Sequence, residues 1–339
     1  MATRRTIVAL RVAGILSLEL VPVFRFRRCV ASVVPARPRR TAVRVAAGLA
    51  LSTLVLVAGC RARSRRADAD TWAGLHDDFG DSVALGRAPV RIVSLNPTTT
   101  EILFAIGAGG RVVGRSVYDV FPAAATRVPS VGPALRPNVE AILAARPDLV
   151  ILYASDDNRP ALARLRAAGI TTVGFKIDSI EQFERDTRLL GRMTNDSARA
   201  TTVADTVAAT LARVRRATSG LARPTVFMPT WDRPVIAIGG GSYLSELLEI
   251  AGARNVYDAV RTPTSVVTLE DVVQRNPDLV LTTPTEAATM RSSPLWRAVP
   301  AVRAGRILVY DTTIVSRPSV TLGAAARELA NLVHPGAVP

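Results

Sequence analysis

Short apolar runs alternate with helix-period segments along the chain after residue 88. The runs are rich in β-branched residues and end near Gly, Pro or Asn, which predicts strands, whereas the segments between them predict helices. Strands that alternate with helices favour parallel sheets in an α/β fold. The predicted strands are 91–95, 111–115, 149–153, 171–177, 224–229, 235–239, 279–283 and 306–311, and the clearest helices are 98–106, 138–145, 159–168, 242–251 and 320–333.

Residues 180–218 form the longest helical pattern, with one interruption at 194–196. The stretch from Ser197 to Ala217 contains no Gly or Pro, and a helix of that length is about 30 Å long, which matches the width of a small lobe. The α/β alternation then starts again. This order predicts two Rossmann-like parallel-sheet lobes joined by one long helix: an N-terminal lobe at 89–178, a bridging region at 179–219 and a C-terminal lobe at 220–334.

One stretch of sequence occurs twice, as NVEAILAARPDLVIL at 138–152 and TLEDVVQRNPDLVLT at 268–282. Glu140 aligns with Glu270, and each copy continues through a Pro-Asp pair into an apolar strand. The separation is too long for a solenoid, whose units are about 20–50 residues. The repeat therefore favours two lobes of similar build.

The net charge of +15 is concentrated at the N-terminus. Residues 1–66 hold fourteen Arg and one Glu, a net charge of +13, so residues 67–339 carry only +2. A nucleic-acid-binding protein needs its basic excess on the folded surface. The charge therefore does not support nucleic acid as a partner.

The basic N-terminus has the features of a bacterial lipoprotein signal peptide. Residues 37–44 are rich in Arg, residues 45–56 form a short apolar run, and small residues precede Cys60. This arrangement resembles a lipobox, which implies cleavage before Cys60 and lipidation of its sulfur. More than one acyl chain would anchor the protein stably. The alternative is a signal anchor with an incidental Cys.

Two further N-terminal stretches complete the expected organisation. Residues 1–36 hold a second apolar stretch, broken by Arg11 and Glu19, which is either sequence upstream of the true start or an extra membrane segment. We assign residues 1–59 to this extension and the signal peptide. Residues 60–88 are polar and aperiodic after Cys60 and are expected to be a flexible tether.

Several classes of site are disfavoured by the residues present. The only Cys are Cys29 and Cys60, so a disulfide framework is not expected in the folded part. The only His are His76 and His334, which disfavours a receptor for free Zn²⁺ or Mn²⁺. We expect neither a metal site nor a cofactor.

An enzyme is also disfavoured. The Gly-rich run at 239–241 has Leu244 where a dinucleotide-binding fingerprint needs Gly. The only Lys is Lys176, so a phosphate-binding Walker lysine is missing, and there is no G-x-S-x-G nucleophile elbow. We therefore do not expect an enzyme.

Four segments resemble one known family: RIVSLNPTTTEILFAIGAGGRVVGRS (91–116), VGPALRPNVEAILAARPDLVI (131–151), GGGSYLSELLEIAGARNVYD (239–258) and TLEDVVQRNPDLVL (268–281). They resemble the substrate-binding proteins of bacterial ABC importers for vitamin B12, haem and ferric siderophores. The resemblance covers roughly residues 89–334, in the correct order. It implies two lobes with a ligand cleft between them, on the periplasmic side of a bacterial membrane or the outer face of the cell membrane.

The resemblance implies a function for the repeated acids. Glu140 and Glu270 match the family's docking acids, one on each lobe, which bind equivalent basic pockets of a permease dimer that works with an ATPase. Charge complementarity of this kind sets orientation and association rate. The plain structural alternative is that each acid follows an N-cap, Asn138 or Thr268, and interacts with the helix dipole.

The ligand is expected in the cleft, beyond the carboxyl ends of the strands. Aromatic faces would stack on a planar ligand, and Arg would pair with carboxylates or phosphate. The candidates are Asn96, Tyr118, Arg136, Trp231, Arg233 and Arg317. Each also has a plain alternative as a solvated or packed loop residue.

The candidate cleft residues also bear on the ligand. Family members for B12 or haem usually have more aromatic residues in these loops, and three Arg would suit an anionic chelate or haem propionates. The sequence leaves cobalamin, haem and siderophore open, with cobalamin less favoured. A signalling or scaffold lipoprotein with the same fold is the other alternative.

Overall fold

The computed structural model describes residues 76–83 and 85–339. The predicted signal peptide, Cys60 and the tether up to residue 75 lie outside the described residues. The chain divides into two compact units, Met1–Gly59 and Cys60–Pro339, and every described residue belongs to the second. Among the described residues, no helix has the length and apolar content needed to cross a bilayer.

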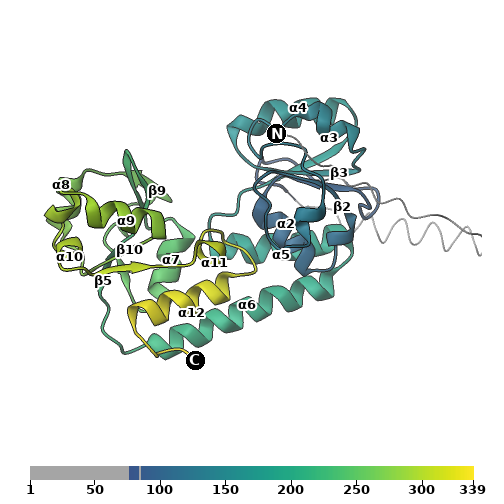
Figure 1. Cartoon of the computed structure of the whole chain (residues 1–339). Coiled ribbons are helices and arrows are strands. Elements are labelled where there is room, and N and C mark those ends of the chain that lie inside the picture. The colour runs from purple at the N-terminus through teal and green to yellow at the C-terminus, as the bar shows by residue number, and fades with distance from the viewer. Residues whose placement is uncertain (1–75, 84) are drawn as a thin grey trace, which may run out of the picture. The chain divides into compact units, whose positions relative to one another are not determined.

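The N-terminal lobe is built on a parallel sheet in the order β2-β1-β3-β4. Helices α3 and α4 lie on one side of the sheet, and α2 lies on the other (Figure 1). Alternate strand residues point to opposite faces, so Val150 packs with α3 and α4 while Ile151 packs with α2. The elements are β1 (Ile92–Ser94), α2 (Pro97–Ala105), β2 (Val112–Arg115), α3 (Val139–Ala144), β3 (Leu149–Tyr153), α4 (Arg159–Ala167) and β4 (Thr171–Phe175).

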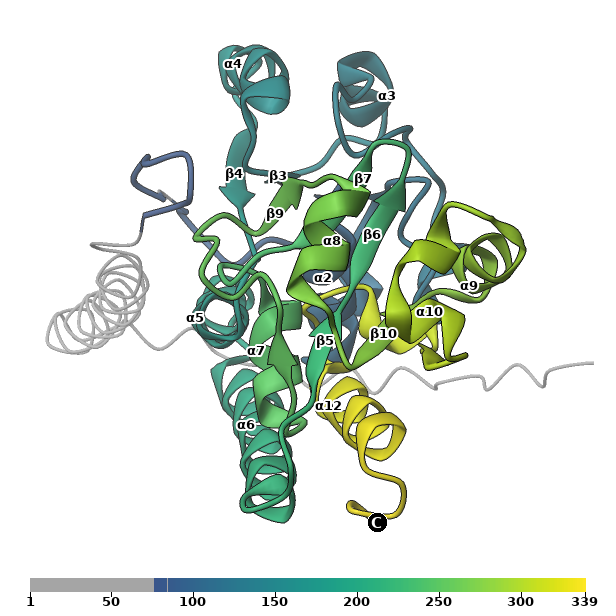
Figure 2. The same ribbon diagram turned by 90° about the vertical axis from the view of Figure 1, so that its left-hand side faces the viewer.

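The C-terminal lobe has a parallel sheet in the order β11-β10-β5-β8. Figure 2 views this lobe from its outer side and shows α8 in front and α12 below. The parallel strands are β5 (Thr225–Phe227), β8 (Arg254–Asn255), β10 (Leu279–Thr282) and β11 (Ile307–Val309). The helices are α7 (Tyr243–Ile250), α8 (Leu269–Arg275), α9 (Pro284–Ser292), α10 (Pro300–Arg303), α11 (Thr312–Val315) and α12 (Leu322–Val333).

An antiparallel sheet is added to the C-terminal lobe. It contains β6 (Pro229–Asp232), β7 (Val235–Ile238) and β9 (Thr264–Val266) in the order β6-β7-β9. The expectation that 235–239 is a strand of a parallel sheet is wrong. Only Arg233 and Pro234 separate β6 from β7, whereas a parallel crossover needs about a dozen residues.

The repeated segment builds the same unit in both lobes. The order β8-β5-β10-β11 matches β2-β1-β3-β4, with β10 in the place of β3. The repeated Asp binds the start of the neighbouring strand in each lobe: Asp148 accepts from the backbone N–H of Arg91 at 2.9 Å, and Asp278 accepts from that of Thr225 at 2.8 Å. The Pro-Asp pair is therefore a structural part of the repeat.

Two helices, not one, make the bridging region. Helix α5 (Ile180–Thr194) ends at Asn195, which is left-handed at φ 61°, and α6 (Ser197–Thr218) follows. Gly191 permits close packing of the pair, because a Cβ there would lie 2.2 Å from the Cβ of Ala200. Helix α6 runs beneath both lobes (Figure 1), and its 22 residues span about 33 Å.

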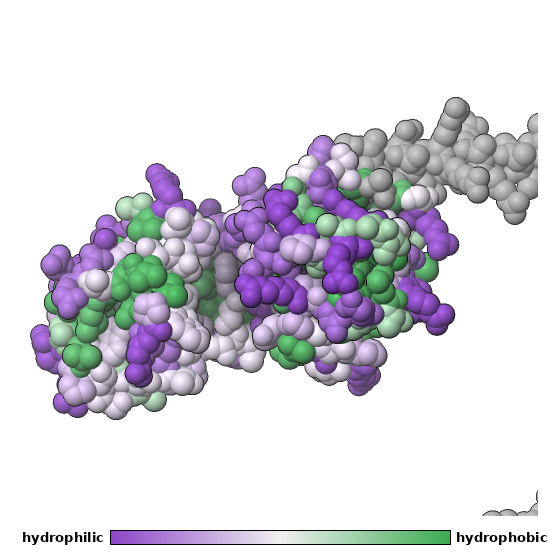
Figure 3. Space-filling model, turned by 90° about the horizontal axis from the view of Figure 1, so that it is seen from above, coloured by the Kyte–Doolittle hydropathy of each residue, from purple (hydrophilic) through white to green (hydrophobic). Residues whose placement is uncertain are grey.

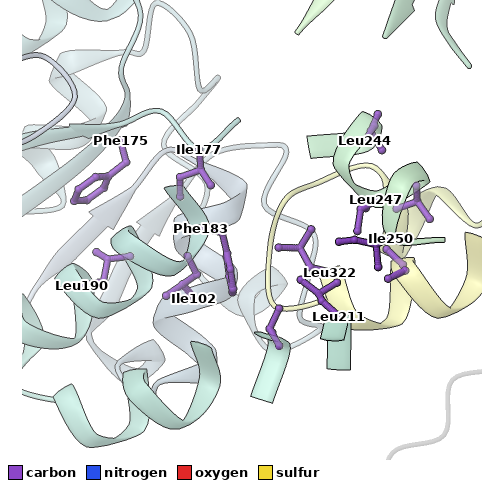
Figure 4. Close-up of a cluster of buried hydrophobic side chains, with 14 of the residues drawn as sticks. Ile102, Phe175, Ile177, Phe183, Leu190, Leu211, Leu244, Leu247, Ile250 and Leu322 are labelled. Carbon is purple, nitrogen blue, oxygen red and sulfur yellow. The ribbon is translucent and has the colours of Figure 1, made fainter. Parts of the chain in front are cut away.

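The core is continuous from one lobe to the other. Buried residues of α2, β4 and α5 belong to the same apolar cluster as buried residues of α6, α7 and α12. Figure 4 shows Phe175 and Phe183 on the N-terminal side, and Leu247 and Leu322 on the other, with Leu211 of α6 beside them. The bridging helices thus belong to the hydrophobic core.

The expected flexible tether ends earlier than residue 88. Asp77 is buried and accepts from the backbone N–H of Gly174 on the edge strand β4 at 3.0 Å. Phe79 fills the space above Gly174, where a Cβ would lie only 2.2 Å from its ring. Composition suggested a tether because the segment is polar and aperiodic. Its acids are in fact bound by backbone N–H groups and Arg166.

The repeated Asp of the C-terminal lobe has a testable effect on stability. The backbone N–H of Thr225 lowers the pKa of Asp278 below its usual value. Because the charged form is favoured in the folded state, this stabilisation is present above the ordinary Asp pKa and is lost as pH falls. We expect Asp278→Ala to lower the free energy of unfolding by about 1 kcal/mol at neutral pH, and by less in acid.

Urea unfolding of the two proteins at several pH values measures this difference. Asp148→Ala should also lower stability at neutral pH, because it removes the equivalent contact in the other lobe. Asp258→Ala, at an exposed position, is the control and should change stability by less than about 0.5 kcal/mol. Equal effects of Asp278→Ala and the control would contradict the structural role.

Candidate functional site

The carboxyl edges of the two parallel sheets face each other. Asp178 follows β4, and its carbonyl accepts from the backbone N–H of Tyr243 in the other lobe at 3.0 Å. Glu101 of α2 accepts from Nε of Arg317, which follows α11, at 2.5 Å. These contacts lie where the lobes meet, and Figure 3 shows the surface hollowed between them. The cleft therefore lies where parallel α/β sheets usually bind ligands.

The N-terminal wall of the cleft carries the loop after β2. Tyr118 is 62% exposed there, and Val117, Val120 and Phe121 are exposed beside it. Asp119 is buried and holds the loop: it accepts from Thr100 Oγ1 at 2.8 Å and from Ser116 Oγ at 2.6 Å. Burial raises the pKa of Asp119, although these hydrogen bonds act in the opposite direction. In this loop the polar side chain of Asp119 is thus buried, whereas the apolar side chains are exposed to solvent.

Asn96 faces the interior of its lobe. It is 4% exposed, its side-chain oxygen caps α2 at the N–H of Thr98, and its side-chain nitrogen donates to the carbonyl of Phe175. Both ends of the amide are therefore used to join β1, α2 and β4. Asn96 therefore stabilises the lobe from a buried position. A residue directly after a central strand is buried because the elements that follow cover it.

The C-terminal wall carries the β6–β7 hairpin. Trp231 on β6 is 59% exposed, and its indole N–H donates to the carbonyl of Arg233 at 3.0 Å. Asp232 accepts from the buried Trp296 at 3.3 Å and so fixes the base of the hairpin to the lobe. The Trp231 ring is thus held at the surface by its own hairpin with most of its area open to solvent.

All three candidate Arg form ion pairs with acids of the protein. Arg136 binds Asp157 at 2.9 Å, Arg233 binds Asp232 at 3.3 Å, and Arg317 binds Glu101 at 2.5 Å. The side chains of Arg136 and Arg233 remain largely exposed, whereas that of Arg317 is 22% exposed. Arg317 is paired with a buried acid that is distant in the sequence, so it is not a free cation. For Arg136 and Arg233, which remain exposed beside their acids, a contact with an anionic ligand stays a prediction.

Sequence reasoning missed the residues at the base of the cleft. Glu101 is 1% exposed, and burial raises its pKa in spite of Arg317 beside it. Tyr153 donates to Asp178 at 3.3 Å, and burial followed by the charge of Asp178 raises the pKa of Tyr153 to about 12. One signal existed: Glu101 is the only charged residue in a helix whose other residues are apolar, Thr or Pro.

The repeated acids occupy equivalent positions. Glu140 and Glu270 are each the second residue of a short helix, α3 or α8, and both are exposed. Asn138 and Thr268 cap these helices with their side chains. Glu140 binds Arg164 at 2.5 Å, and its own backbone N–H does most to lower its pKa. Within the described part of the chain, Glu270 forms no ion pair.

Among residues 76–83 and 85–339, no three His, Cys, Asp or Glu side chains are arranged to hold a metal ion. The site is instead a cleft between two lobes. Each lobe carries an exposed aromatic residue, Tyr118 or Trp231, and the contact of Glu101 with Arg317 lies where the lobes meet.

Comparison with known proteins places this geometry in a family. The family model described as periplasmic binding protein matches residues 92–313. The chain belongs to this family. The resemblance seen in the sequence is thereby confirmed, and so is the fold of two parallel-sheet α/β lobes.

Three relatives of this periplasmic binding protein illustrate the similarity. It is 26% identical over 269 residues to the uncharacterized ABC transporter substrate-binding lipoprotein YvrC of Bacillus subtilis, covering 77% of this chain and 85% of YvrC. It is 30% identical over 274 residues to the cobalamin-binding protein of Halobacterium salinarum, covering 76% of this chain and 73% of that protein. The solved structure of the periplasmic heme-binding protein RhuT from Roseiflexus sp. RS-1 has a TM-score of 0.66 and 25% identity. The match covers 73% of this chain and 98% of RhuT.

The buried Asp119 has a testable titration. Because burial raises its pKa, the folded protein binds this proton more tightly than the unfolded chain does. Stability contributed by the site is therefore greatest below the ordinary Asp pKa and declines as pH rises through the raised value. We expect the stability of the natural protein relative to Asp119→Asn to fall as pH rises above the ordinary Asp pKa.

Chemical denaturation at matched pH values measures the difference. Asp258→Asn, at an exposed position, is the control and should show no such trend. A difference between the natural protein and Asp119→Asn that stays constant with pH would contradict the role of burial.

Proposed function

We propose that the chain is the lipid-anchored substrate-binding component of an ABC importer, which carries a ligand in the cleft to a membrane permease. The family and the two-lobed fold support this assignment. The Bacillus subtilis relative, whose name describes an ABC transporter substrate-binding lipoprotein, supports both the importer and the anchor at Cys60. Binding is non-covalent, and no step of it needs a catalytic group.

The ligand is best matched by a corrinoid of the cobalamin type. The observation that carries this choice is the contrast between two exposed aromatic residues, Tyr118 and Trp231, and three Arg that are already paired. Exposed rings bind the faces of a large planar ligand, whereas a polyanionic chelate needs unpaired cations. The relative in Halobacterium salinarum, named a cobalamin-binding protein, supports the same choice.

Docking to the permease is assigned to Glu140 and Glu270. The supporting observation is that both acids are exposed at the same position of equivalent helices in equivalent lobes. A two-fold symmetric permease offers two equivalent basic pockets, which one chain can fill only if its lobes present equivalent acids. The helix-cap interaction of each acid is compatible with this role, because both side chains remain accessible.

Ligand binding is tested by titration of the chain from Cys60 onward with cobalamin, haemin and ferric hydroxamate, catecholate and citrate chelates. We expect saturable quenching of Trp231 by cobalamin at micromolar concentrations or below. Trp231→Ala and Tyr118→Ala should each weaken binding by about tenfold, which corresponds to the loss of one aromatic contact.

Calorimetry separates binding from optical absorption by these coloured ligands. Arg303→Met, on the outer side of the C-terminal lobe, is the control and should bind normally. Tight binding of a ferric chelate in place of cobalamin would overturn the corrinoid assignment. Binding of no ligand by the folded protein would favour a signalling or scaffold lipoprotein.

Docking is tested by the double variant Glu140→Gln/Glu270→Gln. We expect ligand uptake by cells that depend on this chain to fall by about tenfold or more, because both charge pairs with the permease are lost. Ligand affinity of the purified variant should not change. Glu249→Gln, an exposed acid of α7, is the matched control. Uptake at the natural rate by the double variant would refute the docking assignment.

A further inference from the structure

The ion pair between Glu101 and Arg317 connects the two lobes at the base of the cleft. Glu101 lies on α2 of the N-terminal lobe, and Arg317 lies between α11 and α12 of the C-terminal lobe, 216 residues away in sequence. The pair is a charge-assisted hydrogen bond of 2.5 Å, shorter than most bonds of its kind. Figure 1 shows α11 on the side of its lobe that faces the other lobe.

The pair is buried, and neighbouring contacts fix its geometry. The carboxylate of Glu101 is 1% exposed, and its second oxygen has no hydrogen-bond partner among the described residues. Arg317 donates a second bond to the carbonyl of Thr313 at 3.2 Å, which orients the guanidinium. Separating the pair would leave a buried carboxylate without its cation, with only the hydroxyl of Ser319 close enough to favour its charged form, and a buried unpaired charge is strongly unfavourable.

Other connections between the lobes lie at different elements. Helices α5 and α6 join them from below, and the backbone bond between Asp178 and Tyr243 joins them at the ends of β4 and α7. The bond between Glu101 and Arg317 joins α2 to the segment after α11. It therefore adds a separate restraint on the relative position of the lobes.

We propose that Glu101 and Arg317 are positioning residues that fix the separation of the cleft walls, so that ligand affinity depends on them without their contacting the ligand. The effect on affinity rests on the proposed ligand-binding function. Arg317 thus has a different role from that of a free cation for an anionic ligand. Opening of the cleft requires rupture of the pair, and a variant without it populates the binding-competent separation less often.

The separation of the lobes is measured directly by electron–electron distance spectroscopy. Spin labels are attached at Ala163→Cys on α4 and Ala288→Cys on α9, both exposed, in the chain from Cys60 onward with Cys60→Ser. This chain forms a compact unit and has no other Cys. We expect Arg317→Met to broaden the distance distribution at least about twofold relative to the unsubstituted labelled chain.

Two further variants keep the test valid if Arg317→Met folds poorly. Glu101→Gln retains an acceptor for Arg317 but loses the charge, and Arg317→Lys retains the charge but loses the planar geometry. Both should give intermediate broadening. Arg303→Met is the matched control, because it removes an exposed Arg of the same lobe, and it should leave the distribution unchanged.

Affinity provides the second measurement. If Arg317→Met holds the competent separation for about a tenth of the time, the Kd for cobalamin should rise about tenfold. Distributions that match the natural one in Arg317→Met and Glu101→Gln would overturn the proposal. Broadening in a protein that binds no cobalamin would uphold the connection between the lobes and reject the assigned ligand, so the two failures are distinguishable.

Discussion

Parallel pairing releases the chain at the same edge of a sheet after every strand, and in this protein two such edges are held face to face. The bridging helices belong to the core of both lobes and keep the two edges near each other. The contacts of Asp178 with Tyr243 and of Glu101 with Arg317 join segments that follow these edges. This arrangement determines the position of the cleft. The exposure of its aromatic residues and the equivalence of its two walls also depend on it.

The internal repeat explains how one chain presents two equivalent surfaces. Each copy supplies a capped helix with an exposed Glu at its second position, and then an Asp that binds the backbone of the neighbouring strand. The Asp fixes where the helix and strand sit in the sheet. The orientation of the exposed Glu is therefore a consequence of the same packing in both lobes, even though only Glu140 has an Arg beside it.

Charge at the cleft is largely balanced within the protein. Arg136, Arg233 and Arg317 each have an acid within hydrogen-bonding distance, and the buried Asp119 is bound by hydroxyl and backbone groups. Arg136 and Arg233 nevertheless remain largely exposed, as do the aromatic residues Tyr118 and Trp231.

Local pattern was sufficient for most of the fold, because strands, helix caps and breakers depend on neighbouring residues. The α5–α6 break at Asn195, the repeated unit and the long α6 were all predictable in this way. The bond of Asp77 to β4 and the pairing of Arg317 with Glu101 were not, since each depends on contacts between distant parts of the chain. The antiparallel hairpin is local, and it was missed because residues 235–239 were assigned to a parallel sheet. Sequence by itself determined two lobes, a bridge and the equivalent acids. Only the tertiary structure decided which charges are already paired, because a side chain's partner is set by packing and not by its place in the sequence.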